Sequence, residues 1–142
     1  MSTIDFRPYE GFIFDMDGTI IQTDHIWNQV VRDFLFEANI RAFTEQDTQF
    51  LESLSGMGMY VAAKAVKYHF ALSHTPENMA DRKMALANEY FRKGVDFIPG
   101  FENFHRQLRE AGIPSGIGTN ATPENLEPLK ESMQFHKFFG QH

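Results

Sequence analysis

The chain has 142 residues, of which 42% are hydrophobic and 23% are charged, and its formal net charge is −6. It contains no cysteine, which excludes a disulfide framework and thiolate metal sites. It has no basic cluster typical of nucleic-acid binding and no apolar run near the ~20 residues that span a bilayer. We therefore expect a globular protein that binds neither nucleic acid nor membrane. Since the first residues lack a signal-peptide pattern, we also expect it in the cytoplasm.

The most informative stretch is residues 12–19, which read Phe-Ile-Phe-Asp-Met-Asp-Gly-Thr. Three apolar, β-prone residues predict a buried strand, and Asp15 and Asp17 follow at its carboxyl end, where open α/β sheets bind their ligands. We expect the strand to end there, because Gly18 permits a sharp change of direction. The alternative is a plain acidic turn after a strand, since Asp-Gly is a common turn signal.

Two carboxylates in one pocket suit a hard cation such as Mg²⁺, which prefers oxygen ligands and keeps waters beside a substrate phosphate. Asp15 can act as a nucleophile that forms an aspartyl phosphate. Asp17 can protonate a leaving oxygen and later activate water. Thr19 and the backbone N–H groups around Gly18 can hold phosphate oxygens. This set of groups predicts phosphate chemistry at the end of the strand.

Residues 24–93 are predicted to be almost entirely helical, in four helices. An apolar stripe over residues 26–38 indicates the first helix, and Thr44 with Asp47 three residues later is typical of a helix start. Such an insertion can close over the carboxylates, exclude water and select the leaving group. The two remaining helices are expected over residues 60–72 and from residue 75 onward.

Four cationic or titratable residues of this helical stretch are candidate substrate contacts. His25 follows the two aspartates closely, and we therefore name it as a candidate for binding substrate. For Lys64 and Lys67 we expect a solvated helix face, and for His69 an ordinary surface position.

After the helical stretch, the sequence predicts one more helix and one more strand. Phe101 and Leu108 recur at helical spacing, and Gly112 follows where a helix C-cap is expected. Residues 113–118 make a poor strand on propensity, because two glycines dilute it. Pro123 at a first helical position nevertheless supports a strand–loop–helix order here.

These motifs resemble those of a known family. Asp15-Met16-Asp17-Gly18-Thr19 is similar to the first motif of the haloacid dehalogenase-like phosphohydrolases, and the whole chain resembles their helical-cap group of β-phosphoglucomutases and sugar-phosphate phosphatases. The resemblance implies that Asp15 is the nucleophile, that Asp17 is the acid–base residue, and that both bind Mg²⁺, Asp17 also through its backbone carbonyl. Gln22 departs from the aspartate that this group often has near its hinge.

The stretch that ends in Thr119-Asn120 is similar to the second motif of the same family. The resemblance implies that Thr119 hydrogen-bonds a phosphoryl oxygen and that Asn120 defines the substrate side of the pocket. Alternatively, Thr119, Asn120 or Thr122 only caps the following helix.

The expected fold is α/β: an incomplete Rossmann-like parallel-sheet core with an inserted α-helical cap. Its parts are residues 1–22 as the first core strand, residues 23–94 as the cap and residues 95–142 as a second, truncated βα part. Family members continue with a third strand, a lysine and a later acidic motif, which have no counterpart here. We therefore expect an N-terminal portion of a longer protein, or a core that a second copy or another chain completes.

The resulting functional hypothesis is a Mg²⁺-dependent phosphate monoester hydrolase that acts through a phosphoaspartate. Its expected partner is a small phosphorylated metabolite, with a sugar phosphate as the leading class. One alternative is a phosphomutase of the β-phosphoglucomutase type, which returns the phosphate to a sugar hydroxyl. The other is a catalytically incomplete fragment that only binds its ligand.

Overall fold

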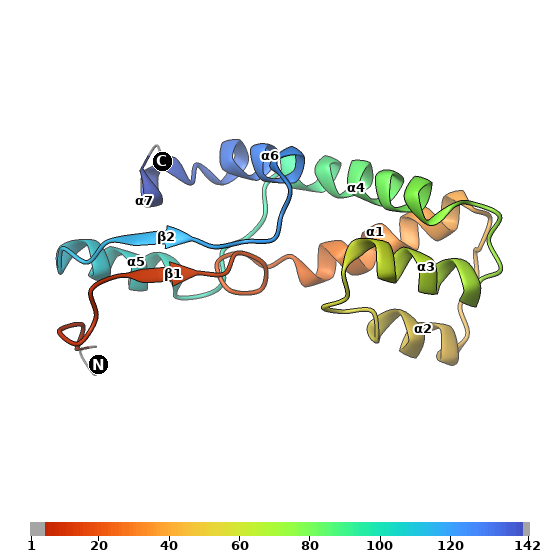
Figure 1. Ribbon diagram of the computed structural model, residues 1–142, viewed down its shortest axis with the longest axis horizontal. Helices are drawn as coiled ribbons and strands as arrows, with labels where there is room; N and C mark the ends of the chain where they lie inside the picture. The colour runs from red at the N-terminus through yellow and green to blue at the C-terminus, as the bar shows by residue number, and fades with distance from the viewer. Residues whose placement is uncertain (1–4, 141–142) are drawn as a thin grey trace. The chain divides into compact units, whose positions relative to one another are not determined.

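The computed structural model describes residues 5–140 of the chain. The chain divides into two compact units: a core unit, Met1–Thr23 with Phe91–His142, and a helical unit, Asp24–Tyr90. An α-helical unit is thus inserted in the sequence between two parallel strands, and the predicted α/β class is confirmed. The elements in chain order (Figure 1) are β1 (Phe12–Phe14), α1 (Asp24–Glu37), α2 (Glu45–Glu52), α3 (Met59–His69), α4 (Pro76–Arg92), α5 (Phe101–Glu110), β2 (Ser115–Ile117), α6 (Pro123–Met133) and α7 (His136–Phe139).

The core unit is built on β1 and β2, which lie side by side as a two-stranded parallel sheet (Figure 1). At the carboxyl end of the sheet, the Gly118 N–H donates to the Phe14 carbonyl at 2.8 Å. A Cβ at Gly118 would lie 3.0 Å from Ile13 Cγ2, so a larger residue here would make the exposed Ile13 side chain shift.

One face of this sheet is covered by aromatic rings. Phe101 and Phe104 of α5 pack edge-on against Phe14, with ring centroids 5.6 and 6.0 Å away. Phe139 of α7 adds a third ring at 6.2 Å from Phe14. On the opposite face, by contrast, the Ile13 side chain is 83% exposed. The aromatic layer therefore supplies most of the apolar burial that holds β1 in place.

A histidine is buried within the aromatic layer. His105 of α5 is 1% exposed, and its Nε2 lies 2.9 Å from Ser115 Oγ on β2. Burial lowers the pKa of His105, and the nearby Arg109 lowers it further. The imidazole is thus held in its neutral form, which links α5 to β2 without placing a charge among the rings.

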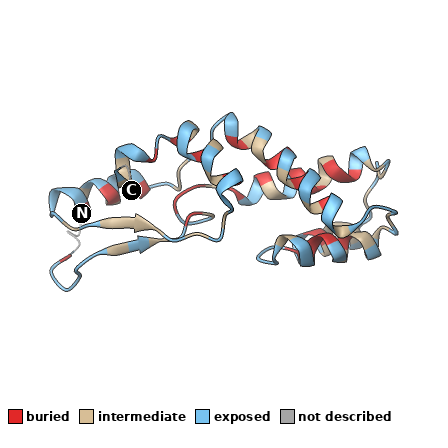
Figure 2. Ribbon diagram, turned by 45° about the horizontal axis from the view of Figure 1, so that its top comes forward, coloured by how far each residue is buried: buried red, intermediate tan, exposed pale blue. Residues whose placement is uncertain are grey.

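In the helical unit, polar contacts join α1 to α4. Arg82 Nε donates to Glu37 Oε2 at 2.8 Å, and the Tyr90 hydroxyl donates to Asp33 Oδ2 at 2.6 Å. Most buried residues of the unit are apolar, and Figure 2 shows all buried positions in red. Within residues 5–140, no helix is long and apolar enough to cross a membrane. The buried apolar residues of this unit are Ile26, Val30, Val31, Phe34, Leu35, Leu51, Leu54, Ala62, Ala63, Val66, Met79, Leu86 and Ala87.

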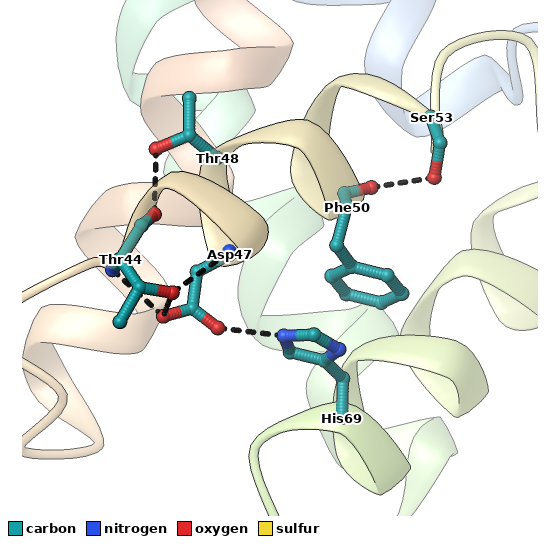
Figure 3. A network of polar contacts seen from close by, with 6 residues as sticks. All are labelled: Thr44, Asp47, Thr48, Phe50, Ser53 and His69. Carbon is teal, nitrogen blue, oxygen red and sulfur yellow. Dashed lines mark hydrogen bonds and ion pairs between the residues drawn. The ribbon is translucent and has the colours of Figure 1, made fainter.

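Thr44 and Asp47 mark the start of α2, as the sequence predicted, and they form a capping box. The Asp47 N–H donates to Thr44 Oγ1 at 3.1 Å, and the Thr44 N–H donates back to Asp47 Oδ2 at 2.8 Å (Figure 3). His69 of α3 lies with Nε2 2.7 Å from Asp47 Oδ1, and its ring stacks on Phe50 with centroids 3.8 Å apart. His69 is exposed, as the sequence predicted, but it also joins α3 to α2 through these two contacts, which the sequence did not predict.

The end of α3 also differs from the expectation. Lys67 Nζ donates to the carbonyl oxygens of Leu72 and His74, at 2.9 and 2.6 Å. Lys67 is therefore a capping residue for the chain that leaves α3, instead of a solvated charge as expected. Lys64, one turn earlier, is exposed as predicted.

Lys83 of α4 is a charged residue on the inward face of its helix. The residue is 3% exposed, although its ammonium nitrogen is not among the buried side-chain atoms that lack a hydrogen-bond partner in the described chain. Burial lowers the pKa of Lys83 from 10.5 to about 8. A shift of this size corresponds to roughly 3 kcal/mol of stability lost near neutral pH. The lysine thus opposes folding of the helical unit.

We expect Lys83→Met to raise the free energy of unfolding at pH 7, because it removes a charge that burial disfavours and keeps a similar side-chain volume. The folded-state pKa of this amine lies below 10.5, so wild-type stability falls as the pH drops from 10.5 to about 8 and is then constant. The advantage of the variant in urea unfolding should therefore shrink as the pH rises from 8 towards 10.5. Lys64→Met, at an exposed position, is the matched control, and an equal gain in both variants would contradict this account.

A second prediction concerns acid. Hydrogen bonds from Thr44, and then the contact with His69, lower the pKa of Asp47 from 3.8 to about 2. A carboxylate with a lowered folded-state pKa stabilises the fold above 3.8, and this contribution is lost as the pH falls from 3.8 to about 2. In urea unfolding, Asp47→Asn should be less stable than wild type at pH 6, and the difference should narrow towards pH 2. A difference that does not change with pH would show that the Asp47 charge has no part in stability.

Candidate active site

The loop after β1 carries the two predicted carboxylates. Asp15 directly follows the strand and is exposed, whereas Asp17 is half-buried. Gly18 has a φ of +71°, which confirms the sharp exit expected from the sequence. Met16, between the two aspartates, is 1% exposed, and its carbonyl oxygen accepts N–H groups of the following turn. The loop is therefore a tight turn anchored on a buried residue.

Asp17 has a buried partner that the sequence reasoning missed. Thr23 is fully buried, and its hydroxyl donates to Asp17 Oδ1 at 2.7 Å. This bond occupies one carboxylate oxygen and fixes the direction of the group, while Oδ2 has no partner among the described residues. No local pattern marks this contact, since the threonine lies beyond the turn and follows two apolar residues and Gln22.

The backbone of the same turn corrects one expectation. The Gly18 N–H donates to the Ile21 carbonyl at 2.9 Å, and the Thr19 N–H donates to the Met16 carbonyl at 3.3 Å. These two N–H groups are engaged within the loop, because the turn closes on itself, so they are not free for a phosphate. Thr19 can still bind phosphate through its side chain. This side chain is exposed, and its hydroxyl has no partner among the described residues.

Thr119 and Asn120 follow β2 at the edge of the sheet where Asp15 follows β1. Because the strands are parallel and in register, their carboxyl ends meet at this edge. Thr119 is half-buried, and its hydroxyl oxygen accepts the Ala121 N–H at 3.1 Å, which leaves its proton to be donated. Asn120 is exposed. The two loops thus bring carboxylates and a hydroxyl to one edge.

The next helix begins at Thr122, which is the N-cap of α6, with Pro123 at its first turn as predicted. Thr122 makes no side-chain capping hydrogen bond. Asn125, one turn into the helix, is 5% exposed, and its Oδ1 is a buried acceptor without a partner in the described chain. Because Thr122 is the N-cap, the alternative in which Thr119 or Asn120 caps this helix is wrong.

The remaining predicted residue, His25, lies in the helical unit. It is the second residue of α1, and it is exposed. The contact with substrate proposed for it from the sequence stays a prediction.

The oxygen ligands on these loops are of the type that a hard cation prefers. Asp15 and Asp17 supply carboxylate oxygens on one turn, and Mg²⁺ is commonly held by one or two carboxylates together with waters and substrate oxygens. Within the part of the chain that the structure describes, no group of three or more acidic or histidine side chains is gathered that could enclose a metal. The oxygen ligands of this loop are therefore of the kind that a hard cation takes.

An open cavity of about 720 Å³ lies elsewhere in the core unit. None of the predicted site residues lines this cavity. Residues that do line it include Gln22, the segment 93–97 and the end of α6. The candidate chemistry is therefore located on an exposed loop edge and not in this hollow.

With this geometry described, comparison with known proteins identifies the family. The sequence profile of the haloacid dehalogenase-like hydrolases matches residues 12–141. A probable pseudouridine-5'-phosphatase of Saccharomyces cerevisiae is 29% identical over 110 residues, which cover 77% of this chain and 44% of that protein.

Solved structures agree on the fold. A hydrolase of the same superfamily from Entamoeba histolytica has a TM-score of 0.74 at 17% identity, over 92% of this chain and 58% of that one. A Bacillus subtilis hydrolase, in a crystal bound to magnesium, has a TM-score of 0.71 at 15% identity, over 92% of this chain and 62% of that one. The chain thus spans less than two thirds of the length of each of these relatives. The profile match over nearly its whole length shows that this chain belongs to the haloacid dehalogenase-like hydrolase family.

Proposed function

We propose that this chain carries the nucleophile and the acid–base residue of a Mg²⁺-dependent phosphate monoester hydrolase. The observation that supports this most is the loop after β1, where exposed Asp15 and half-buried Asp17 lie on one glycine turn. The unequal environments of the two carboxylates suit two roles, since a nucleophile must reach phosphorus whereas an acid–base group benefits from a fixed orientation.

The reaction has two steps. In the first, a carboxylate oxygen of Asp15 attacks phosphorus, and the P–O bond to the alcohol breaks. The departing oxygen takes a proton from Asp17, and the phosphoryl group is left on Asp15. In the second, Asp17 accepts a proton from water, whose oxygen attacks phosphorus and releases Asp15 with inorganic phosphate.

The other residues of the two loops would hold the phosphoryl group. Thr119 can donate its hydroxyl proton to a phosphoryl oxygen, because its oxygen already accepts the Ala121 N–H. Thr19 can donate in the same way from the exposed turn, and Asn120 can bound the substrate side. Magnesium held by Asp15 and Asp17 would offset the repulsion between the carboxylate and the phosphate ester. Thr23 keeps Asp17 in one orientation throughout.

The named relatives support this choice of chemistry. The yeast relative is named as a probable pseudouridine-5'-phosphatase, and the Bacillus subtilis structure contains magnesium. We propose a small phosphorylated metabolite, such as a sugar or nucleoside phosphate, as the substrate. Because each relative is longer, residues beyond this chain, from the same protein or from a partner, would complete the activity.

We expect Mg²⁺-dependent hydrolysis of an aryl phosphate that is abolished by Asp15→Asn and reduced by about 10²- to 10⁴-fold by Asp17→Asn. The loss in Asp17→Asn should be smaller for an aryl phosphate than for an alkyl phosphate, because a phenolate leaves without a proton. Asp81→Asn, at an exposed position of α4, is the control for a lost surface carboxylate.

Phosphate release at fixed enzyme concentration, with magnesium and with a chelator, measures these effects. Undiminished hydrolysis in Asp15→Asn would overturn the assignment of the nucleophile. No hydrolysis by the wild-type chain would favour the alternative of a module that only binds. Transfer of the phosphoryl group to a sugar hydroxyl would favour the phosphomutase.

A further inference from the structure

The two segments that connect the core unit to the helical unit are paired with each other. We call residues 20–23 the incoming segment and residues 93–98 the outgoing segment. The Ile98 N–H donates to the Ile20 carbonyl at 2.8 Å, and the Gln22 N–H donates to the Asp96 carbonyl at 2.9 Å. Between these two bonds, residue 21 forms an antiparallel bridge with residue 97. The segments therefore make a short two-stranded ladder at the edge of the core unit.

A side chain extends this ladder. Gln22 Nε2 donates to the Phe97 carbonyl at 3.1 Å, so that residue 22 binds the outgoing segment through both its backbone and its side chain. The ring of Phe97 is anchored in the aromatic layer, with centroids 5.5 Å from Phe101 and 5.1 Å from Phe138. The Phe97 carbonyl is therefore a fixed acceptor, and Gln22 is the side chain that satisfies it.

The incoming segment also holds the loop of Asp17. The Ile21 carbonyl accepts the Gly18 N–H at 2.9 Å, and the Ile21 N–H donates to the Met16 carbonyl at 3.1 Å. One residue further, Thr23 donates to Asp17 Oδ1 at 2.7 Å. Thr23 and Ile21 are fully buried, so these contacts form a rigid connection. Gln22 thus lies between the two residues that bind the Asp17 loop.

From these contacts we propose that Gln22 is a positioning residue, which couples the outgoing segment to the orientation of the Asp17 carboxylate. The proposal rests on the acid–base role proposed for Asp17. Loss of the Gln22–Phe97 bond lets the two segments move apart at residue 22. The displacement of Gln22 then reaches Asp17 through Ile21 and Thr23, the chain neighbours of Gln22.

The position of Gln22 favours hydrogen bonding over packing as its role. Gln22 is half-buried and borders the cavity of about 720 Å³, together with residues 93–97. Its side chain therefore has open space on one side, and its volume contributes little to the core. A donor is needed here, because a carboxylate at this position would face the Phe97 carbonyl with an acceptor and leave both unsatisfied.

Three substitutions separate hydrogen bonding from size. Gln22→Glu keeps the shape and replaces the donor with an acceptor, whereas Gln22→Lys keeps a donor that can reach the Phe97 carbonyl. Gln49→Glu makes the same change on the exposed side of α2 and controls for the added charge.

The first measurement is amide hydrogen exchange of the full chain, which does not require activity. We expect Gln22→Glu to accelerate exchange of the Ile98 amide and also of the Gly18 amide, each by about tenfold. Gln22→Lys and Gln49→Glu should exchange like wild type at both positions. Faster exchange at Ile98 with no change at Gly18 would overturn the coupling, because the Asp17 loop would then be independent of the ladder.

The second measurement is the kinetics of aryl phosphate hydrolysis. Gln22→Glu should lower kcat by about tenfold with KM unchanged, and Gln22→Lys should restore kcat. In a double-mutant cycle with Thr23→Val, the two losses should be less than additive, since both act on Asp17. Fully additive losses, or a change in KM alone, would overturn the proposal. If the wild type does not hydrolyse the aryl phosphate, the proposed function fails. The rate of hydrogen exchange at the Gly18 amide then decides by itself whether Gln22 is coupled to the Asp17 loop.

Discussion

The parallel pairing of β1 with β2 is the constraint on which the rest of this structure depends. Two parallel neighbours bring their carboxyl ends to one edge, and here those ends carry Asp15 and Thr119. Parallel strands also require a long connection, which cannot be a tight hairpin. In this chain, the connection is long enough to contain a complete helical unit. The same backbone geometry therefore gathers the polar groups and makes room for the insertion.

Glycine at one position next to the sheet has a clear conformational reason. The positive φ of Gly18 allows the turn that follows Asp15. Rings on α5 and α7 then compensate for the short strands by covering Phe14. The aromatic packing thus lies on one face of the sheet, while the carboxylates proposed for catalysis lie on a loop at its end.

The fixed direction of Asp17 follows from contacts outside the turn itself. Thr23 reaches back across six residues to bind the carboxylate, and the incoming segment that contains it is paired with the outgoing segment. A general acid must lie within hydrogen-bond reach of the proton that it transfers, so that its orientation matters as much as its pKa. The segments that lead to the helical unit therefore also hold Asp17, the residue proposed as the acid–base group.

Local signals in the sequence predicted the parts of this molecule that depend on neighbouring residues. The strand before Asp15, the helix start at Thr44 and Asp47, and the proline start of α6 were predicted correctly. The burial expected of that strand was wrong, because Ile13 on its open face is 83% exposed. Contacts between distant residues were missed, because nothing in the local pattern encodes them. Gln22 binds a carbonyl 75 residues away, and His69 binds a carboxylate 22 residues away.

The engagement of the Gly18 N–H within its own turn was missed for a different reason. A turn motif predicts that the chain reverses, but it does not predict which carbonyl each N–H will find. The inward position of Lys83 was missed because a lysine on an amphipathic helix is ordinarily solvated.

The most direct test of the account is to trap the covalent intermediate. The chain would be mixed with magnesium and a phosphate ester, quenched in acid within the first turnover, digested, and its peptides weighed by mass spectrometry. We expect one added phosphoryl group on the peptide that contains Asp15, none after a longer incubation that exhausts the substrate, and none in Asp15→Asn. Hydrolysis that proceeds with no phosphorylated Asp15, or with the phosphoryl group on another residue, would contradict this expectation.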